Sequence, residues 1–279
     1  MDMINYVDLH THTTASDGVC TPAHNVRLAL QAGLVAVAIT DHDTVSGIDE
    51  ARQEGERIGI EVVPGVEIST VERGVDVHIL GYYMDDKSSI FNERLAQLRS
   101  TRNIRNDLIL SRLSELGIGI TMNEVHDHLT KQKSVDQTLG RPHIADVLVA
   151  RGFVHTVAEA FELYLGKGGA AYVNPPRIGP KEAIEWIREA GGKAVLAHPG
   201  LYNNEDIVLD IIQYGIDGIE AYHSDHNEEQ QQHYYELATR HGLIVTAGSD
   251  FHGTKAGVTF HGAIGSRRID ARILELLKE

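Results

Sequence analysis

Imidazole and carboxylate side chains recur in closely spaced groups along this chain. His10 and His12 are two residues apart, and Asp250 and His252 repeat this spacing near the other end. In an extended segment, residues two apart project from the same face, so each pair can reach one ion. Imidazole and carboxylate are ligands of zinc, manganese and iron where no thiolate is available. The spacing therefore predicts a metal site.

The composition agrees with a metal site of this kind and excludes several classes of protein. The chain has 279 residues with 16 His, against 10 Tyr and 5 Phe, and its 1 Cys rules out a disulfide framework or a thiolate-rich zinc site. A net charge of −15 argues against a protein that coats duplex nucleic acid or anionic membrane. The sequence shows neither a signal-peptide pattern nor an apolar stretch of membrane-spanning length, so we expect a soluble cytoplasmic protein.

Short apolar runs that alternate with helical patterns predict the elements that carry these side chains. The predicted strands are Tyr6–Leu9, Ala36–Thr40, Glu61–Val66, Val77–Tyr82, Ala194–Ala197, Gly218–Ala221 and Ile244–Ala247, with a weaker one at Ala263–Gly265. The predicted helices between them are Pro22–Gln31, Ser46–Ile58, Pro180–Ala190, Ile207–Tyr214 and Glu228–His241. Apolar strands separated by helices are typical of a buried parallel sheet. About seven such units favour an α/β barrel over a long open sheet, although periodicity alone leaves both open.

The middle of the chain breaks this alternation. Residues 88–173 read mostly as helix, with predicted helices at Phe91–Leu116, Asn123–Leu129, Pro142–Ala150 and Val157–Tyr164. We interpret this stretch as a helical insertion in a barrel domain formed by residues 1–87 and 174–279. Loops at the carboxyl side of a parallel barrel build its active site, so the insertion is expected to act as a substrate cap.

The candidate ligands follow, or lie within, successive predicted strands. They are His10, His12, Asp17, His42, Glu67, His78, His198, Asp250 and His252. In a parallel barrel these strand ends converge on one mouth. The set is larger than one ion needs and suits two or three ions if a carboxylate such as Glu67 bridges a pair. Histidines without this placement, His261 among them, are interpreted as surface or core residues.

Four motifs in this order resemble the PHP (polymerase and histidinol phosphatase) phosphoesterases over almost the whole chain. They are His10-x-His12, Thr40-Asp41-His42-Asp43, Ala197-His198-Pro199 and Ser249-Asp250-x-His252. The resemblance implies a distorted (β/α)7 barrel with a trinuclear metal cluster at its carboxyl mouth. It implies one ion on His10, His12, Glu67 and Asp250, a second that shares Glu67 and adds His78 and His198, and a third on Asp17, His42 and His252. The ions could be Mn, Zn or Fe, since this ligand set suits all of them.

Three segments resemble the stand-alone, nucleotide-directed members of that family. Histidinol phosphatases commonly carry His where Asp17 stands, and the Gly140–His143 and Leu165–Gly168 segments also match the nucleotide-directed type. We therefore predict a metal-dependent phosphatase for a small phosphorylated nucleotide. The favoured substrates are a 3′,5′-nucleotide bisphosphate and the 5′ end of a short single-stranded oligonucleotide. A cyclic nucleotide phosphodiesterase, a histidinol phosphatase and a non-catalytic metal-binding scaffold are the alternatives, and the oligomeric state stays open.

The chemistry of phosphate-ester hydrolysis suggests roles for the remaining polar residues. A hydroxide that bridges two ions is expected to attack phosphorus in line, while the third ion offsets developing charge. Asp43 is expected to orient a ligand imidazole, with helix capping as an equal alternative. His223 is the candidate general acid or phosphate contact, against a surface-loop role. A second phosphate is expected on Arg141, because Arg grips phosphate bidentately, with Lys167 or His143 beside it.

Overall fold

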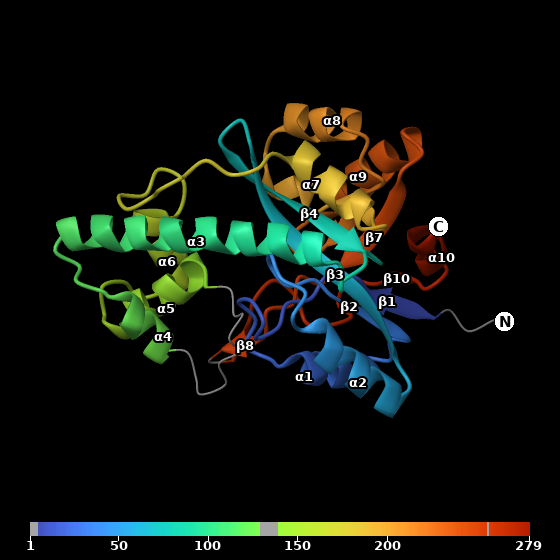
Figure 1. The fold of residues 1–279 in the computed structure, drawn as a ribbon, viewed down its shortest axis with the longest axis horizontal. Helices are drawn as coiled ribbons and strands as arrows, with labels where there is room; N and C mark the ends of the chain where they lie inside the picture. The colour runs from blue at the N-terminus through green and yellow to red at the C-terminus, as the bar shows by residue number, and fades with distance from the viewer. Residues whose placement is uncertain (1–4, 129–138, 256) are drawn as a thin grey trace.

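The computed structural model describes residues 5–128, 139–255 and 257–279 of the chain (Figure 1). Its centre is an eight-stranded sheet in the order β10-β1-β2-β3-β4-β5-β6-β7. The strands are β1 (Tyr6–Asp8), β2 (Ala36–Ile39), β3 (Glu61–Glu72), β4 (Val75–Tyr82), β5 (Lys193–Leu196), β6 (Gly218–His223), β7 (Ile244–Gly248) and β10 (Ile269–Asp270). The backbone N–H of Leu9, just after β1, donates to the carbonyl of Ala247 in β7, so the sheet is nearly closed. This confirms the predicted α/β barrel.

One predicted strand departs from the parallel arrangement, and the edge strand β10, which the sequence did not predict, also pairs antiparallel with β1. Strand β4 is antiparallel to both of its neighbours, β3 and β5, whereas β2 is parallel to β1 and β3. Arg73 and Gly74 join β3 to β4 with positive φ angles of 49° and 73°. This is the backbone of a tight two-residue hairpin, and so short a connection cannot cross over to a parallel strand. The expected all-parallel sheet is therefore wrong at β4, and Ala263–Gly265 is a turn rather than a strand.

Helices lie around the barrel (Figure 1). They are α1 (Pro22–Gln31), α2 (Ile48–Ile58), α7 (Pro180–Glu189), the short 3-10 helix η2 (Pro199–Leu201), α8 (Glu205–Gln213), α9 (Glu228–Arg240) and α10 (Ile273–Lys278). Helix α1 begins as predicted, since the Thr21 side chain accepts from the His24 N–H and Pro22 takes the first helical position. Fully buried Ile68, Ile79 and Ile187 belong to the largest apolar cluster, where β3 and β4 pack against α7.

A run of helices lies between β4 and α7, within residues 88–173. It contains α3 (Ser89–Glu115), α4 (Met122–His128), α5 (Arg141–Ala150), α6 (Val157–Ala160) and the π-helix η1 (Phe161–Leu165). Figure 1 shows α3 running from the barrel out to the group formed by α4, α5 and α6. Ile109, Leu113, Ile144 and Leu148 form an apolar cluster of this group, separate from the barrel clusters. Leu129, the end of one predicted helix, lies outside the described residues.

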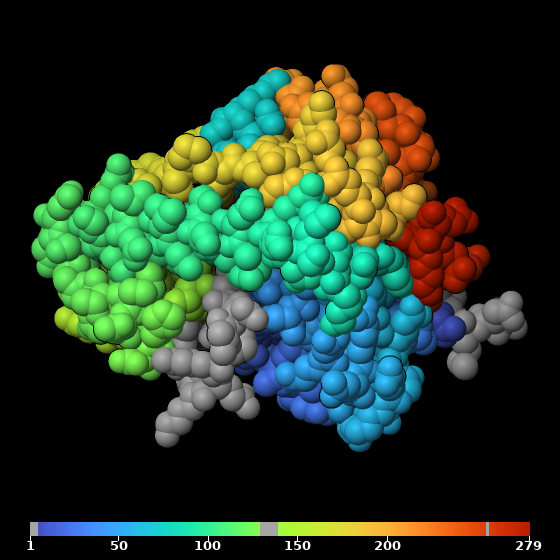
Figure 2. Space-filling model, viewed as in Figure 1, coloured from blue at the N-terminus to red at the C-terminus, as the bar shows by residue number. Residues whose placement is uncertain are grey.

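Helix α3 connects the two parts of the molecule. Its first turns bring Phe91, Leu95 and Leu98 into the main barrel cluster, while its later turns belong to the helical group. In Figure 2, α3 lies across the face of the molecule between the N-terminal helices and the segment before α7. None of the helices in the described ranges combines the length and apolar character needed to cross a membrane.

Candidate metal centre

Backbone hydrogen bonds bring the ligand-bearing loops together at the mouth of the barrel. The N–H of Asp250 donates to the carbonyl of His10 at 2.9 Å, and the N–H of His12 donates to the carbonyl of Phe251 at 2.9 Å. On the other side, the N–H of Thr40 donates to the carbonyl of Thr11 at 3.0 Å. The segment after β1 therefore lies between those that follow β2 and β7, as convergence of strand ends requires.

The first group contains His10, His12, Glu67 and Asp250, all of which are buried. Nε2 of His12 lies 3.1 Å from Oε2 of Glu67 and 3.2 Å from Oδ1 of Asp250. Nε2 of His10 lies 3.3 Å from the same Asp250 oxygen and 3.1 Å from Nε2 of His12. Donor atoms that ligate one ion at about 2.1 Å stand roughly 3 to 3.5 Å apart. The spacing of this group therefore fits a single cation.

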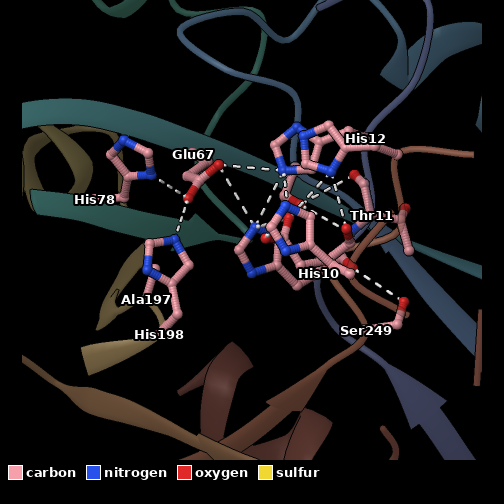
Figure 3. A network of polar contacts seen from close by, with 12 residues as sticks. His10, Thr11, His12, Glu67, His78, Ala197, His198 and Ser249 are labelled. Carbon is pink, nitrogen blue, oxygen red and sulfur yellow. Dashed lines mark hydrogen bonds and ion pairs between the residues drawn. The ribbon is translucent and has the colours of Figure 1, made fainter. Parts of the chain in front are cut away.

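Glu67 lies between two groups of imidazoles (Figure 3). Its Oε1 is 2.7 Å from Nδ1 of His78 and 3.0 Å from Nε2 of His198. Its Oε2 faces His12 and is also 2.9 Å from Nδ1 of His42. Burial alone would raise the pKa of Glu67, but the imidazoles of His78, His42 and His10 hold it well below its usual range. Each oxygen of this ionised carboxylate therefore faces a different donor set, as a bridging ligand does.

The imidazole of His198 is suited to metal ligation in its neutral form. Burial lowers the pKa of His198 to about 4, even though Glu67 acts in the opposite direction. A neutral imidazole offers a lone pair to a cation, whereas an imidazolium does not.

A third group surrounds Asp17. Oδ1 of Asp17 lies 3.1 Å from Nε2 of His252, and Oδ2 lies 3.6 Å from Nε2 of His42. His12 also reaches this group, because its Nδ1 is 3.6 Å from Oδ1 of Asp17. Burial would raise the pKa of Asp17, but His252 and His42 hold it well below its usual range. The structure thus brings together the side chains expected to hold a third ion.

An unpaired buried oxygen tests whether the site fits cations. Oδ1 of Asp250 is buried and, among the described residues, has no hydrogen-bond partner. Besides the His10 and His12 nitrogens, Nδ1 of His252 lies 3.4 Å away. A buried carboxylate oxygen without a hydrogen bond costs at least about 1–3 kcal/mol. A divalent cation among these nitrogens would remove that cost, so the donor set fits metal binding.

Sequence reasoning missed Glu220, which lies behind His10. Glu220 is fully buried in β6, and its Oε1 is 3.0 Å from Nδ1 of His10. Its Oε2 accepts from the N–H of His198 at 2.9 Å. The contact with Nδ1 orients the His10 ring so that Nε2 faces Glu67 and Asp250. The available signal was a carboxylate inside an otherwise apolar predicted strand.

Replacing Glu220 by Gln is expected to weaken metal binding by about 10- to 100-fold, because His10 loses the anion that orients its ring. Titration of the metal-free protein with Mn²⁺ or Zn²⁺ measures this effect. Glu205→Gln is the matched control, since Glu205 also contacts an imidazole, His233, but on the exposed surface at 3.0 Å. Equal affinities in the two variants would contradict an orienting role for Glu220.

His261 was also missed, because sequence reasoning treated it as a surface or core residue. It follows a hairpin of β8 (Thr254–Lys255) and β9 (Val258–Thr259), and its Nε2 lies 3.6 Å from Oδ2 of Asp250. Its Nδ1 contacts Asp225 at the rim of the site. Asp250 offers the largest contribution that raises the pKa of His261 to about 9. His261 does not follow a predicted strand, so its position in the sequence gave no signal. The β8–β9 hairpin returns the chain to the mouth of the barrel.

The two residues singled out as catalytic have partners inside the protein. His223 is fully buried; its Nδ1 accepts from the N–H of Asp225 at 3.1 Å and its Nε2 lies 3.3 Å from Oδ2 of Asp250. Asp43 accepts from the N–H of Ser69 at 2.8 Å and from the Arg102 guanidinium at 2.6 Å. The hydrogen bonds of the Asp43 carboxylate therefore lead to the Ser69 backbone and to Arg102 rather than to a ligand imidazole or a helix cap.

A cavity opens beside the metal centre, between the barrel and the inserted helices. It is lined by Asp17, His42, Ser69, Asp76, His78, Arg102, Arg105, Arg141, Pro142, Phe161 and Arg177. Of the predicted substrate contacts, the cavity lining includes Arg141. His143 is buried and its Nδ1 accepts from the N–H of Gly140, whereas Lys167 is exposed outside the lining described here. Sequence reasoning missed Arg102, Arg105 and Arg177.

Comparison with known proteins matches the PHP domain to residues 8–195. The chain is 38% identical over 252 residues to the 5′–3′ exoribonuclease Rnm of Escherichia coli (strain K12), covering 88% of this chain and 84% of that protein. It is 32% identical over 256 residues to a 3′,5′-nucleoside bisphosphate phosphatase of Chromobacterium violaceum, covering 90% and 88%.

Two further proteins match this chain over most of their length, one in sequence and one in structure. The chain is 32% identical over 249 residues to a phosphoribosyl 1,2-cyclic phosphate 1,2-diphosphodiesterase of Eggerthella lenta, covering 88% of this chain and 94% of that one. A crystal structure from Bifidobacterium adolescentis, of a protein proposed to be a metal-dependent phosphoesterase, superposes with a TM-score of 0.87 at 34% identity. That match covers 97% of this chain and 94% of the other.

Proposed function

Because the chain belongs to the PHP domain family, we propose that it hydrolyses phosphate monoesters of nucleotides. It is a metal-dependent phosphoesterase, and the favoured substrates are a 3′,5′-nucleotide bisphosphate and the 5′ end of a short oligonucleotide. The observation that carries this proposal is the shared cavity. Asp17, His42 and His78 of the candidate metal centre line the same cavity as four arginines. A site with cations on one side and guanidinium groups on the other suits a substrate with more than one phosphate.

We propose that three divalent ions, Mn, Zn or Fe, occupy the centre. The proposed ligand sets are His10, His12, Glu67 and Asp250; then Glu67, His78 and His198; and then Asp17, His42 and His252. Such ions polarise phosphoryl oxygens and lower the pKa of bound water. Glu67 holds the first two sets together through its two oxygens. The buried, ionised state of Glu67, Asp17 and Asp250 supports this assignment.

His223 and Asp43 are proposed as positioning residues. Since Nδ1 of His223 accepts from the Asp225 N–H, its proton lies on Nε2 and points to Asp250. A role as general acid would require that proton to leave Asp250, so the arrangement favours holding the Asp250 carboxylate in place. Asp43 holds the Arg102 guanidinium, which also donates to Ser69 Oγ at 2.5 Å on the cavity wall.

The inserted helices are proposed to act as a substrate cap on the barrel domain of residues 1–87 and 174–279. Of the cavity lining, α3 contributes Arg102 and Arg105, the start of α5 contributes Arg141 and Pro142, and η1 contributes Phe161. The Arg141 guanidinium lies 5.7 Å from the centre of the Phe161 ring, which helps to hold it over the cavity. Residues 88–173 thus provide much of the positive side of the site.

Chromatographic product analysis across a substrate panel tests the proposed function, with phosphate release measured in parallel because it reports the hydrolysis of monoesters but not of diesters. The panel contains adenosine 3′,5′-bisphosphate, a short 5′-phosphorylated RNA, a 2′,3′-cyclic nucleotide and histidinol phosphate, with metal content measured on the same sample. We expect kcat/KM for the bisphosphate or the RNA to exceed that for histidinol phosphate by at least about tenfold, the effect of one additional phosphate contact. Hydrolysis confined to the cyclic nucleotide would favour the phosphodiesterase alternative. Full metal content without hydrolysis would favour a binding scaffold.

A further inference from the structure

We propose that Arg105 selects substrates that carry a second phosphate group, one nucleoside away from the group that is hydrolysed. This inference rests on the proposed nucleotide phosphatase activity and adds a specificity-determining residue to it. The sequence pointed to Arg141 for this role. The pairing of the arginines in the structure points instead to Arg105.

Three of the four cavity arginines already have carboxylate partners. The guanidinium of Arg102 lies 2.6 Å from Oδ2 of Asp43. Arg141 lies 2.7 Å from Oδ2 of Asp76, and Arg177 contacts the other oxygen of the same carboxylate. One aspartate therefore serves two arginines, and these arginines are held in place before any substrate arrives.

Arg105 differs from these three. It is 5% exposed, and its Nε is buried without a hydrogen-bond partner. Within the described ranges it makes neither an ion pair nor a hydrogen bond. Burial and the neighbouring guanidinium groups of Arg102, Arg141 and Arg177 lower the pKa of Arg105 to about 8. A buried guanidinium without an anion costs folding stability, so its presence in a cavity indicates a bound anion in the working state.

The charges in the cavity match a phosphate dianion. Asp43 balances Arg102, and Asp76 balances one of Arg141 and Arg177. Four guanidinium groups thus face two carboxylates, and the charge of Arg105 and that of one of Arg141 and Arg177 stay unbalanced. The arginine side therefore carries two surplus positive charges when Arg105 is protonated. A terminal phosphate carries a charge near −2 at neutral pH, whereas an internucleotide diester carries −1. The charge balance therefore favours a terminal second phosphate over the next diester of an RNA chain.

Kinetics of Arg105→Met test this selection. Adenosine 3′,5′-bisphosphate and adenosine 3′-monophosphate share the same 3′ ester, and only the bisphosphate can place a second phosphate on Arg105. We expect the variant to lower kcat/KM for the bisphosphate by about 10- to 100-fold, as loss of a charged hydrogen bond does. The loss for the monophosphate should be at least tenfold smaller. Equal losses on both nucleotides would overturn the inference.

Arg94→Met is the matched control for this variant. Arg94 lies on the same helix α3 but pairs with Glu189 and stacks on Trp186, outside the lining of this cavity. Its replacement should leave the ratio of the two kcat/KM values at the wild-type level. A 5′-phosphorylated dinucleotide forms a further arm. If Arg105→Met impairs hydrolysis of the dinucleotide alone, the assignment to a terminal phosphate is wrong.

Two further measurements separate a binding role from a structural one. Because Met removes an unpaired buried charge, the ligand-free Arg105→Met protein should have a Tm equal to or above that of the wild type. A clear fall in Tm together with equal kinetic losses would indicate a structural role. If the wild type hydrolyses neither nucleotide, calorimetry can still measure the Kd of adenosine 3′,5′-bisphosphate for the wild type and for Arg105→Met. The proposed function then fails, and an unchanged Kd in the variant overturns the inference independently.

Discussion

Glu67→Gln is expected to lower kcat/KM for nucleotide hydrolysis by about 10³-fold or more, beyond the 10- to 100-fold typical of groups that only support a ligand. Both oxygens of Glu67 face imidazole nitrogens, at 2.7 and 3.0 Å on one side and 2.9 and 3.1 Å on the other. Gln keeps the size of the side chain but replaces one oxygen with an amide NH₂, which cannot ligate a cation. Metal content and kcat/KM measured on one preparation check this prediction.

Glu61→Gln is a suitable control for Glu67→Gln. Glu61 lies on the same strand β3, where it accepts from Tyr83 Oη at 2.9 Å on an exposed surface. Its replacement should leave both activity and metal content near the wild-type values. Circular dichroism establishes that both variants are folded. If Glu67→Gln were folded, fully loaded with metal and active, the bridging role of Glu67 would be refuted.

The barrel and its candidate ligands were predictable because the ligands come directly after the apolar segments that form the strands. His10, His12, His42 and Asp250 each follow a run of apolar residues, and parallel strands of a barrel end on one side. The sequence correctly predicted that His78 lies in a strand, but it did not predict the direction of that strand, β4. Apolar runs look alike in parallel and antiparallel strands, and only the Arg73-Gly74 turn distinguishes the two.

The arginine side of the site was largely hidden from sequence reasoning. Arg102 and Arg105 belong to a long helix with charged residues throughout, so nothing in the sequence marks these two as residues of the site. They share the cavity with Arg141, Phe161 and Arg177, which lie far along the chain, and local spacing does not encode such long-range proximity. Glu220 was hidden for a related reason, since its partner His10 lies 210 residues away in the chain.

The arginines around the cavity also show that the net charge of the chain does not describe the charge at the site. The chain has a net charge of −15, yet Arg102, Arg105, Arg141 and Arg177 gather around one cavity. A net negative charge repels extended anions at long range, but a local group of guanidinium groups in a recessed cavity attracts a small one. The two features together favour small phosphorylated substrates over long nucleic acids.

Asp250→Asn is expected to lower kcat/KM by about 10²- to 10³-fold, comparable to the loss of a group that stabilises the transition state directly. The Asp250 carboxylate faces His10 and His12 through Oδ1, at 3.3 and 3.2 Å, and His223 through Oδ2 at 3.3 Å. Asp250 has a φ of 53°, and Asn is one of the residues that tolerate this left-handed backbone. The fold should therefore persist, and the lost charge accounts for the effect. Asp225→Asn, the same change at the rim beside His261, is the control.

Metal content distinguishes the Asp250 and Glu67 variants from each other. Asp250 belongs to one proposed ligand set, whereas Glu67 belongs to two, so Asp250→Asn should lose about one ion per chain and Glu67→Gln about two at limiting metal. Elemental analysis of both variants, purified in parallel, measures the difference. Equal losses would contradict the bridging assignment, because a carboxylate that bridges two ions should affect more bound metal than one that serves a single ion. The stoichiometry of the two variants therefore tests the arrangement of the centre independently of the substrate.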